Sequence, residues 1–216
     1  MSLAVRLMEF EPVVRIYEGP LWRRSPVVGA LFGLPFEKEL ERVLAAIAPA
    51  ETAIVVDVAC GPGIYTRPIA RGMSHGRVVG LDLSRPMLRT AQRLARADQV
   101  QNVRFVCGNA LALPIRTQVA DAVNCCGALH LFPDVARALR EMHRVMRAGG
   151  RLTLAVFARG EGKLSFVANR VRRRLVGIHA FTPSELEATL RQTGFDDVRF
   201  LHRGRIWQVL TARRER

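Results

Sequence analysis

A glycine-rich segment follows the first continuous apolar run of the chain. This segment, Asp57-Val58-Ala59-Cys60-Gly61-Pro62-Gly63, lies between the run 53–58, which is typical of a buried strand, and a predicted helix over 63–72. Glycines at such a turn let backbone approach a ligand closely, and the first N–H groups of the helix are free to face it. The segment therefore predicts a nucleotide-binding loop, although an ordinary tight turn has a similar pattern.

Two acidic residues limit the class of ligand that this loop is expected to bind. Asp82 ends the next predicted strand, 77–82, at about the separation from the loop where an acid binds ribose hydroxyls. Asp82 is also placed to cap the following helix, but Ser84 is better placed for that. Asp57 at the start of the loop would repel a pyrophosphate and attract an ammonium group. The pair therefore favours S-adenosylmethionine over a dinucleotide.

Alternating strands and helices position these residues. Strand patterns over 53–58, 77–82, 103–107, 119–125 and 151–157 alternate with helical patterns, and Gly149-Gly150 are expected to end the helix over 134–147. Short connections between such units imply a parallel sheet with helices on both faces. The last two strands, 197–202 and 205–212, form a predicted hairpin, which makes one strand antiparallel. The expected fold is thus α/β and Rossmann-like, with seven mostly parallel strands.

The flanks of this core form two further units. Residues 1–48 are predicted to be an N-terminal cap that ends in an amphipathic helix over 37–48, with Glu37 to Glu41 on its polar face. Residues 49–216 are the core, and residues 158–180 are a lid-like insert after the fifth strand.

A family resemblance rests on motifs spread over residues 50–157. Asp57 to Gly63, Val78 to Asp82, Gly108-Asn109-Ala110, Asp121-Ala122-Val123 and Glu141 to Gly150 resemble the successive motifs of class I S-adenosylmethionine-dependent methyltransferases. They are most similar to the ubiquinone/menaquinone-biosynthesis type, also called methyltransferase type 11. The segment 128–133 and parts of the N-terminus are similar to uncharacterised plastid and bacterial members.

The resemblance implies a cofactor role for each matched position. Asp57 would hold the methionine amino group through the loop, Gly61 and Gly63 would let the cofactor lie against backbone, and Asp82 would bind the ribose. Ala59 stands where the family usually has a glycine, and Asn109 where it usually has an acid. The complete predicted cofactor set is Asp57, Ala59, Cys60, Gly61, Gly63, Asp82, Leu83, Met87, Asn109, Ala110, Cys126 and Gly127. No metal site is predicted.

Methyl transfer needs an aligned acceptor more than a catalytic group, so a general base is optional. His130 follows the fourth strand at the ligand-binding edge of the sheet and is the candidate base, although it is equally compatible with a packing role. Tyr17 is the second candidate, and Tyr65 could also face the pocket.

The segment 164–178 bears on the acceptor. Leu164, Val167, Val171, Leu175 and Ile178 recur at helical spacing, and arginines cluster at 170–174. This pattern fits a lid with a solvated face or an interfacial helix that meets anionic lipid.

Together with the net charge of +14, this segment leaves three hypotheses about the function open. The first is O- or C-methylation of a small apolar acceptor such as a quinone, phenol or polyketide. The second is an RNA or protein methyltransferase that uses its basic surface, although the charge is spread along the chain. The third is a cofactor-binding cyclisation catalyst or scaffold that does not methylate.

Composition fits a cytoplasmic globular protein. Apolar residues make up 49% of the chain, no apolar run approaches the length of a membrane span, and the first residues lack the pattern of a secretory signal. The four cysteines show no metal-ligand spacing and are interpreted as apolar core thiols. Peripheral membrane contact remains an expectation of the 164–178 helix, and the oligomeric state is left open.

Overall fold

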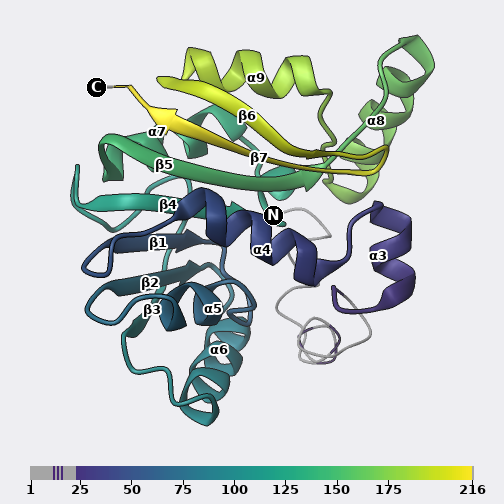
Figure 1. Ribbon diagram of the computed structural model, residues 1–216. Coiled ribbons are helices and arrows are strands. Elements are labelled where there is room, and N and C mark those ends of the chain that lie inside the picture. The colour runs from purple at the N-terminus through teal and green to yellow at the C-terminus, as the bar shows by residue number, and fades with distance from the viewer. Residues whose placement is uncertain (1–11, 13, 15, 17–22, 216) are drawn as a thin grey trace.

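A seven-stranded sheet forms the centre of the computed structural model, which describes residues 12, 14, 16 and 23–215 (Figure 1). The strand order is β3-β2-β1-β4-β5-β7-β6. The first five strands pair in parallel, and β7 lies antiparallel between β5 and β6. The predicted Rossmann-like sheet with its C-terminal hairpin is confirmed. The strands are β1 (Ile54–Val58), β2 (Arg77–Asp82), β3 (Val103–Cys107), β4 (Ala120–Cys126), β5 (Met146–Phe157), β6 (Phe195–Arg203) and β7 (Trp207–Arg214).

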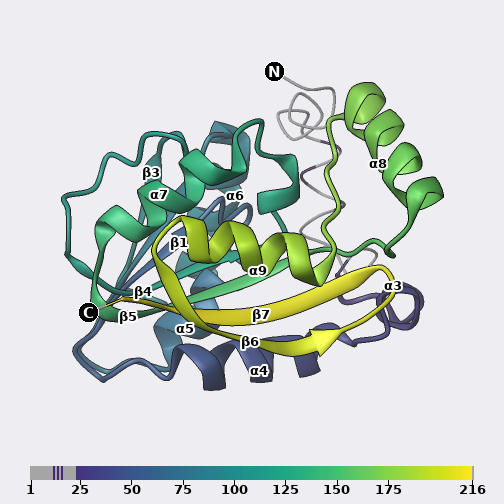
Figure 2. The same ribbon diagram turned by 90° about the horizontal axis from the view of Figure 1, so that it is seen from above.

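Helices cover both faces of the sheet (Figure 2). Apolar side chains of α7 and α9 pack on one face, and those of α4 and α5 pack on the other. Helix α6 contacts β2 and β3, while α3 and α8 lie at one end of the sheet (Figures 1 and 2). The helices are α3 (Pro26–Phe32), α4 (Phe36–Ile47), α5 (Thr66–Arg71), α6 (Arg85–Ala97), α7 (Val135–Val145), α8 (Lys163–Val176) and α9 (Pro183–Gln192). None of the helices that the structure describes is long and apolar enough to cross a membrane.

Side-chain caps begin two helices, and the cap at Ser84 confirms the prediction made above. Ser84 accepts a hydrogen bond from the Met87 N–H at the start of α6. Thr182 and Glu185 form a capping box at α9, in which each side chain accepts from the backbone N–H of the other. These local interactions explain why the starts of both helices were predictable from sequence.

The junction between α7 and β5 differs from expectation. The helix ends at Val145 rather than at Gly149-Gly150, and β5 begins at once with Met146. Gly149 instead lies within the strand at φ +72°, where the pairing of β5 with β4 shifts register. A glycine suits a bulge as well as a helix end, so its position in the sequence did not distinguish them.

Two surface predictions also need correction. Cys60, Cys125 and Cys126 are buried thiols as expected, but Cys107 at the end of β3 is exposed. Helix α8 turns its apolar stripe toward solvent, with Leu164 89% and Leu175 71% exposed. The polar side of this helix is exposed as the lid interpretation expects, but the apolar side that a lid would bury is exposed too.

Candidate functional site

The glycine-rich loop leaves β1 in a series of left-handed turns. Ala59, Gly61 and Gly63 have φ values of +55°, +54° and +79°. The loop is held from below, because the Cys60 N–H donates to the Leu81 carbonyl at 2.9 Å and the Gly63 N–H donates to the Cys60 carbonyl at 3.0 Å. Helix α5 begins only at Thr66, so the predicted helix start near Gly63 is a turn instead.

The two glycines of the loop differ in the space beside their Cα atoms. A Cβ on Gly61 would meet no atom within 4 Å, so this backbone borders free space. A Cβ on Gly63 would lie 3.6 Å from the Ala91 side chain and 3.7 Å from that of Phe105, inside the protein. The geometry therefore offers Gly61 to a ligand and uses Gly63 for packing and for its positive φ.

Asp57 is buried beneath the loop, 2% exposed. Its Oδ2 accepts from the Thr66 hydroxyl, and its Oδ1 accepts from the Asn124 Nδ2 at 2.8 Å. Burial raises the pKa of the carboxyl to about 6, although both hydrogen bonds lower it. The group is thus largely ionised at neutral pH, and it joins β1 to α5 and β4.

Asp82 closes the loop from the end of β2. Its Oδ2 accepts from the Gly61 N–H and its Oδ1 accepts from the Ser84 N–H, both at 2.8 Å. Burial raises the pKa of this carboxyl, and the backbone donors oppose that shift. Each carboxylate oxygen keeps a lone pair for a further donor, so the geometry remains compatible with binding of ribose hydroxyls.

The predicted adenine contacts lie beyond Asp82 along the same edge. Leu83 is 47% exposed, whereas Met87 and Ala110 are buried. Asn109 is exposed, and its Oδ1 accepts from the Leu111 N–H at 2.9 Å. This hydrogen bond orients the amide that replaces the usual acid of the family.

The end of β4 forms the other wall. The Cys126 thiol donates to the Asn124 Oδ1 at 3.1 Å, and the Gly127 N–H donates to the Ala155 carbonyl at 2.8 Å. Gly127 has φ +89°, and a Cβ built on it would meet nothing within 4 Å. Free space thus borders backbone on both Gly61 and Gly127.

One cavity joins much of this predicted set to residues that sequence reasoning did not identify. It is lined by Asp57, Ala59, Cys60, Gly61, Tyr65, Cys126, Gly127 and His130 from the predicted residues. Gly63, Asp82, Leu83, Met87, Asn109 and Ala110 lie outside this cavity, and Asp82 is linked to it through Gly61. Its further walls are Arg23, Phe32, Pro62, Ile64, Phe157 and Trp207.

A buried polar cluster supports the aromatic side of the cavity. Glu39 is fully buried and accepts from the guanidinium of Arg23, from the Tyr65 hydroxyl and, at 2.9 Å, from the Trp207 indole N–H. The prediction that Glu39 belongs to the polar face of its helix is wrong, because three donors from other segments satisfy it in the interior. Helical periodicity could not reveal those partners, which lie far away along the chain.

The guanidinium of Arg23 is only partly paired within the described residues. Its Nη2 donates to Glu39, but its buried Nη1 has no hydrogen-bond partner among the described residues. Burial opposes the charge, yet the nearby Glu39 carboxylate raises the pKa of the guanidinium overall. The group also lies 4.9 Å from the ring centres of both Phe32 and Trp207. Among the described residues lining the cavity, only Arg23 carries a positive side chain at neutral pH.

His130 faces this cavity as an uncharged ring. It is 4% exposed and packs edge-on against Phe157 and Trp207, with ring centres 4.5 and 6.0 Å apart. Burial, with a smaller effect of Arg172, lowers the pKa of the imidazole to about 3. Its Nδ1 has no partner in the described part of the chain, so it can form a hydrogen bond with a ligand. Tyr17 lies outside the described residues, and Tyr65 is committed to Glu39.

Comparisons with known proteins agree with this geometry. Residues 55–150 match the family described as methyltransferase domain. A demethylmenaquinone methyltransferase of Lactiplantibacillus plantarum is 39% identical over 114 residues, which cover 52% of this chain and 48% of that protein. An uncharacterized chloroplastic methyltransferase of Arabidopsis thaliana is 29% identical over 204 residues, covering 90% of this chain and 56% of that one. The chain thus spans about half the length of these curated relatives.

Similarity in fold extends over nearly the whole chain. The crystal structure of an S-adenosylmethionine-dependent methyltransferase from Aquifex aeolicus superimposes with a TM-score of 0.71 at 18% identity, covering 94% of this chain and 97% of that one. Residues 55–150 therefore resemble a methyltransferase domain, and the sheet has the fold of class I S-adenosylmethionine-dependent methyltransferases. Within that class, the matched region is similar to demethylmenaquinone methyltransferases.

Proposed function

We propose that the protein transfers the methyl group of S-adenosylmethionine to an oxygen or carbon of a small apolar or aromatic acceptor, such as a quinone, phenol or polyketide. The observation that carries the proposal is the single cavity in which the loop at Asp57 and Gly61 meets the aromatic side chains of Phe32, Phe157 and Trp207. One end of the cavity suits the polar cofactor, and the other end suits an apolar ring.

The residues present fit the cofactor. Free space over Gly61 and Gly127 admits a ligand against backbone, and Asp57 provides a negative charge for an ammonium group. The buried Nη1 of Arg23, which has no partner among the described residues, suits the cofactor's carboxylate, since a guanidinium binds carboxylates with charge-assisted hydrogen bonds. When bound, S-adenosylmethionine supplies a methyl group activated by the positive sulfur.

The protein contributes alignment and exclusion of water. Aromatic rings around His130 exclude water from the part of the cavity where the substrate would bind. The Nδ1 of the neutral His130 ring can accept a hydrogen bond from a hydroxyl group of that substrate. A pKa of about 3 makes this imidazole a weak base, so its proposed role is to orient the hydroxyl and polarise its O–H bond. The name of the Lactiplantibacillus relative gives a quinone acceptor for that protein and supports a ring acceptor here.

The first test is calorimetric titration with S-adenosylhomocysteine. Wild type should bind at micromolar concentrations. Asp82→Ala should lose at least tenfold in affinity, because it removes both the ribose acceptor and the support of the Gly61 N–H. Asp196→Ala on β6 serves as the matched control and should bind as wild type does. Failure of folded wild type to bind would contradict the proposal.

The second test identifies the acceptor class. Protein given methyl-labelled cofactor is incubated separately with reduced quinones and phenols, with RNA, and with a protein extract. Label in the organic extract supports the proposal. Label in RNA or protein would instead favour use of the basic surface. Binding without any transfer would favour a cyclisation catalyst or a scaffold.

A further inference from the structure

Helix α8 presents its apolar side chains to solvent. Leu164, Val167, Val171 and Leu175 are 89%, 57%, 50% and 71% exposed. At about 100° per residue they fall on one stripe of the helix. In a soluble protein such a stripe normally faces the core, whereas in α8 the stripe is exposed together with Arg170, Arg173 and Arg174.

Polar contacts hold α8 in this orientation. Asn169, on the opposite side, is 7% exposed. Its Nδ2 donates to the Ala180 carbonyl and its Oδ1 accepts from the Ala180 N–H, both at 3.0 Å. Rolling the helix to bury its leucines would break this buried pair of hydrogen bonds. The outward stripe is therefore a specified feature of the fold.

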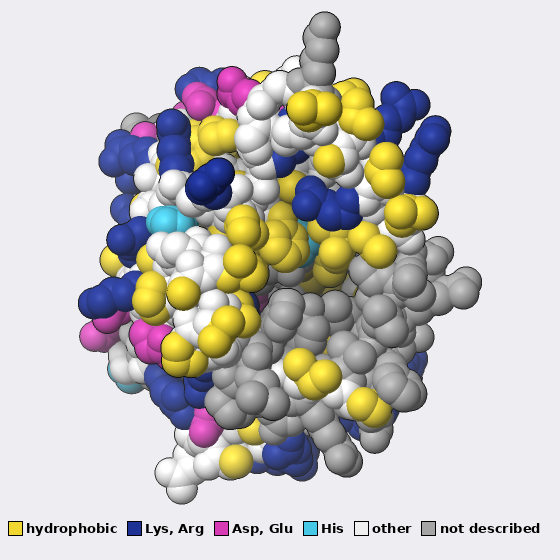
Figure 3. All heavy atoms as spheres, turned by 90° about the vertical axis from the view of Figure 1, so that its right-hand side faces the viewer, with side chains coloured by type: hydrophobic (Ala, Val, Ile, Leu, Met, Phe, Trp, Pro, Cys, Tyr) yellow, Lys and Arg dark blue, Asp and Glu magenta, His cyan; other side chains and the backbone are white. Residues whose placement is uncertain are grey.

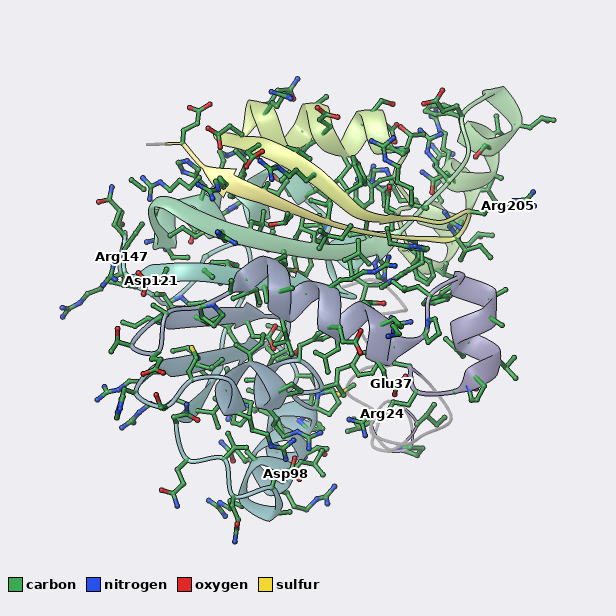
Figure 4. The ribbon with its side chains drawn as sticks, in the orientation of Figure 1. Arg24, Glu37, Asp98, Asp121, Arg147 and Arg205 are labelled. Atoms are coloured by element: carbon green, nitrogen blue, oxygen red, sulfur yellow. The ribbon has the colours of Figure 1, made fainter. Side chains whose placement is uncertain are left out.

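Positive charge surrounds the stripe. Helix α8 carries Arg170, Arg172, Arg173 and Arg174 and has no acidic residue. Arg205, in the turn between β6 and β7, lies on the same side of the molecule, whereas Arg147 and its ion-pair partner Asp121 lie at the opposite edge (Figure 4). Viewed from that side, hydrophobic side chains gather with lysines and arginines beside them (Figure 3).

The same side holds the site. Strand β5 leads through a short connection into α8, and β1, β2 and β4 run parallel to β5, so their carboxyl ends point toward this end of the molecule (Figure 1). Helix α3, whose Phe32 lines the cavity, also exposes Val27 and Leu31 here, 76% and 59%. The apolar surface therefore adjoins the end of the sheet where the acceptor would enter.

We infer that α8 docks this face on an anionic lipid surface. The apolar stripe enters the boundary between headgroups and acyl chains, while Arg170 and Arg174 meet lipid phosphates. A second copy of the chain is a poorer partner, because a symmetric contact would oppose two sets of basic residues with no acid on either helix. The inference rests on the proposed function in one respect: an apolar methyl acceptor would reach the site from the lipid.

Vesicle sedimentation of the full chain tests this docking. Wild type should bind vesicles of phosphatidylcholine with about one-third phosphatidylglycerol and should bind phosphatidylcholine alone far more weakly. Arg170→Gln with Arg174→Gln should weaken binding to the anionic vesicles about thirtyfold, at roughly a factor of five for each arginine near the surface. Leu164→Ser with Leu175→Ser should weaken it at least as much.

A matched control separates local charge from total charge. Arg96→Gln with Arg104→Gln removes two exposed arginines from α6 and β3, away from α8, and should bind as wild type does. An equal loss in both arginine pairs, or no preference of wild type for anionic vesicles, would overturn the inference. A concentration-dependent dimer abolished by the leucine changes, without vesicle binding, would assign the stripe to self-association and would also overturn it. Each variant is also titrated with S-adenosylhomocysteine, which measures cofactor binding separately. A loss of vesicle binding can therefore be distinguished from a loss of cofactor binding.

Discussion

The carboxylate of Glu39 and the indole of Trp207 meet in the interior, where Oε2 accepts from Nε1 at 2.9 Å. Helix α4 and the first residue of β7 are thereby joined directly behind the aromatic wall of the cavity. Since Arg23 and Tyr65 also donate to Glu39, one buried carboxylate holds together four segments of the chain. The shape of the proposed acceptor end therefore depends on residues outside the glycine-rich loop.

Removal of this carboxylate should destabilise the folded protein. Glu39→Ala leaves the Arg23 charge buried without its partner, and we expect the free energy of unfolding to fall by about 3–5 kcal/mol. Urea unfolding followed by circular dichroism measures the change. Glu41→Ala is the control on the same helix, since exposed Glu41 pairs with exposed Lys38, and it should change stability by less than about 1 kcal/mol. Comparable losses in both variants would refute the special role of Glu39.

Ala59 tests the strain of the loop. A non-glycine residue at φ +55° is unfavourable, so Ala59→Gly should raise the free energy of unfolding by up to about 1 kcal/mol. Ala45→Gly in the exposed part of α4 makes the same chemical change in helical backbone and should lower it by about 0.5–1 kcal/mol. Opposite signs are the expected result, and a loss of stability at both positions would show that the loop is not strained at Ala59.

Local signals predicted most of the fold, and long-range partners account for what was missed. The strands β1 to β4, the caps of α6 and α9 and the positions of Asp57 and Asp82 follow from periodicity, capping chemistry and the loop pattern. Glu39 was misplaced because helical periodicity says nothing about donors arriving from β7 and from residue 23. The orientation of α8 was also missed, since the spacing of its leucines is identical whether they face the core or solvent.

His130 should remain neutral across the physiological range. Its pKa of about 3 in the folded protein lies below the ordinary 6.5, so its contribution to stability is complete above pH 6.5 and is lost as the pH falls toward 3. In an NMR titration its ring signals should not shift between pH 8 and about pH 5. The His130→Gln variant identifies those signals. A midpoint near 6.5 would show that the ring is solvated and would remove the argument for a dry acceptor end.

Arg23 provides the sharpest test of how the cofactor is held. If the Nη1 of Arg23 binds the carboxylate of the cofactor, Arg23→Met should weaken S-adenosylhomocysteine binding by about ten- to a hundredfold. This is the effect of losing a hydrogen bond to a charged group. Decarboxylated S-adenosylhomocysteine lacks that group, and Arg23→Met should bind it as well as wild type does. The ratio of the two affinities is informative even if the variant is less stable, because partial unfolding weakens both ligands equally. The double variant Arg23→Met with Glu39→Gln removes both buried charges and should show the same ratio. Equal weakening of both ligands would restrict Arg23 to a structural role beside Glu39, and the carboxylate would then need another partner.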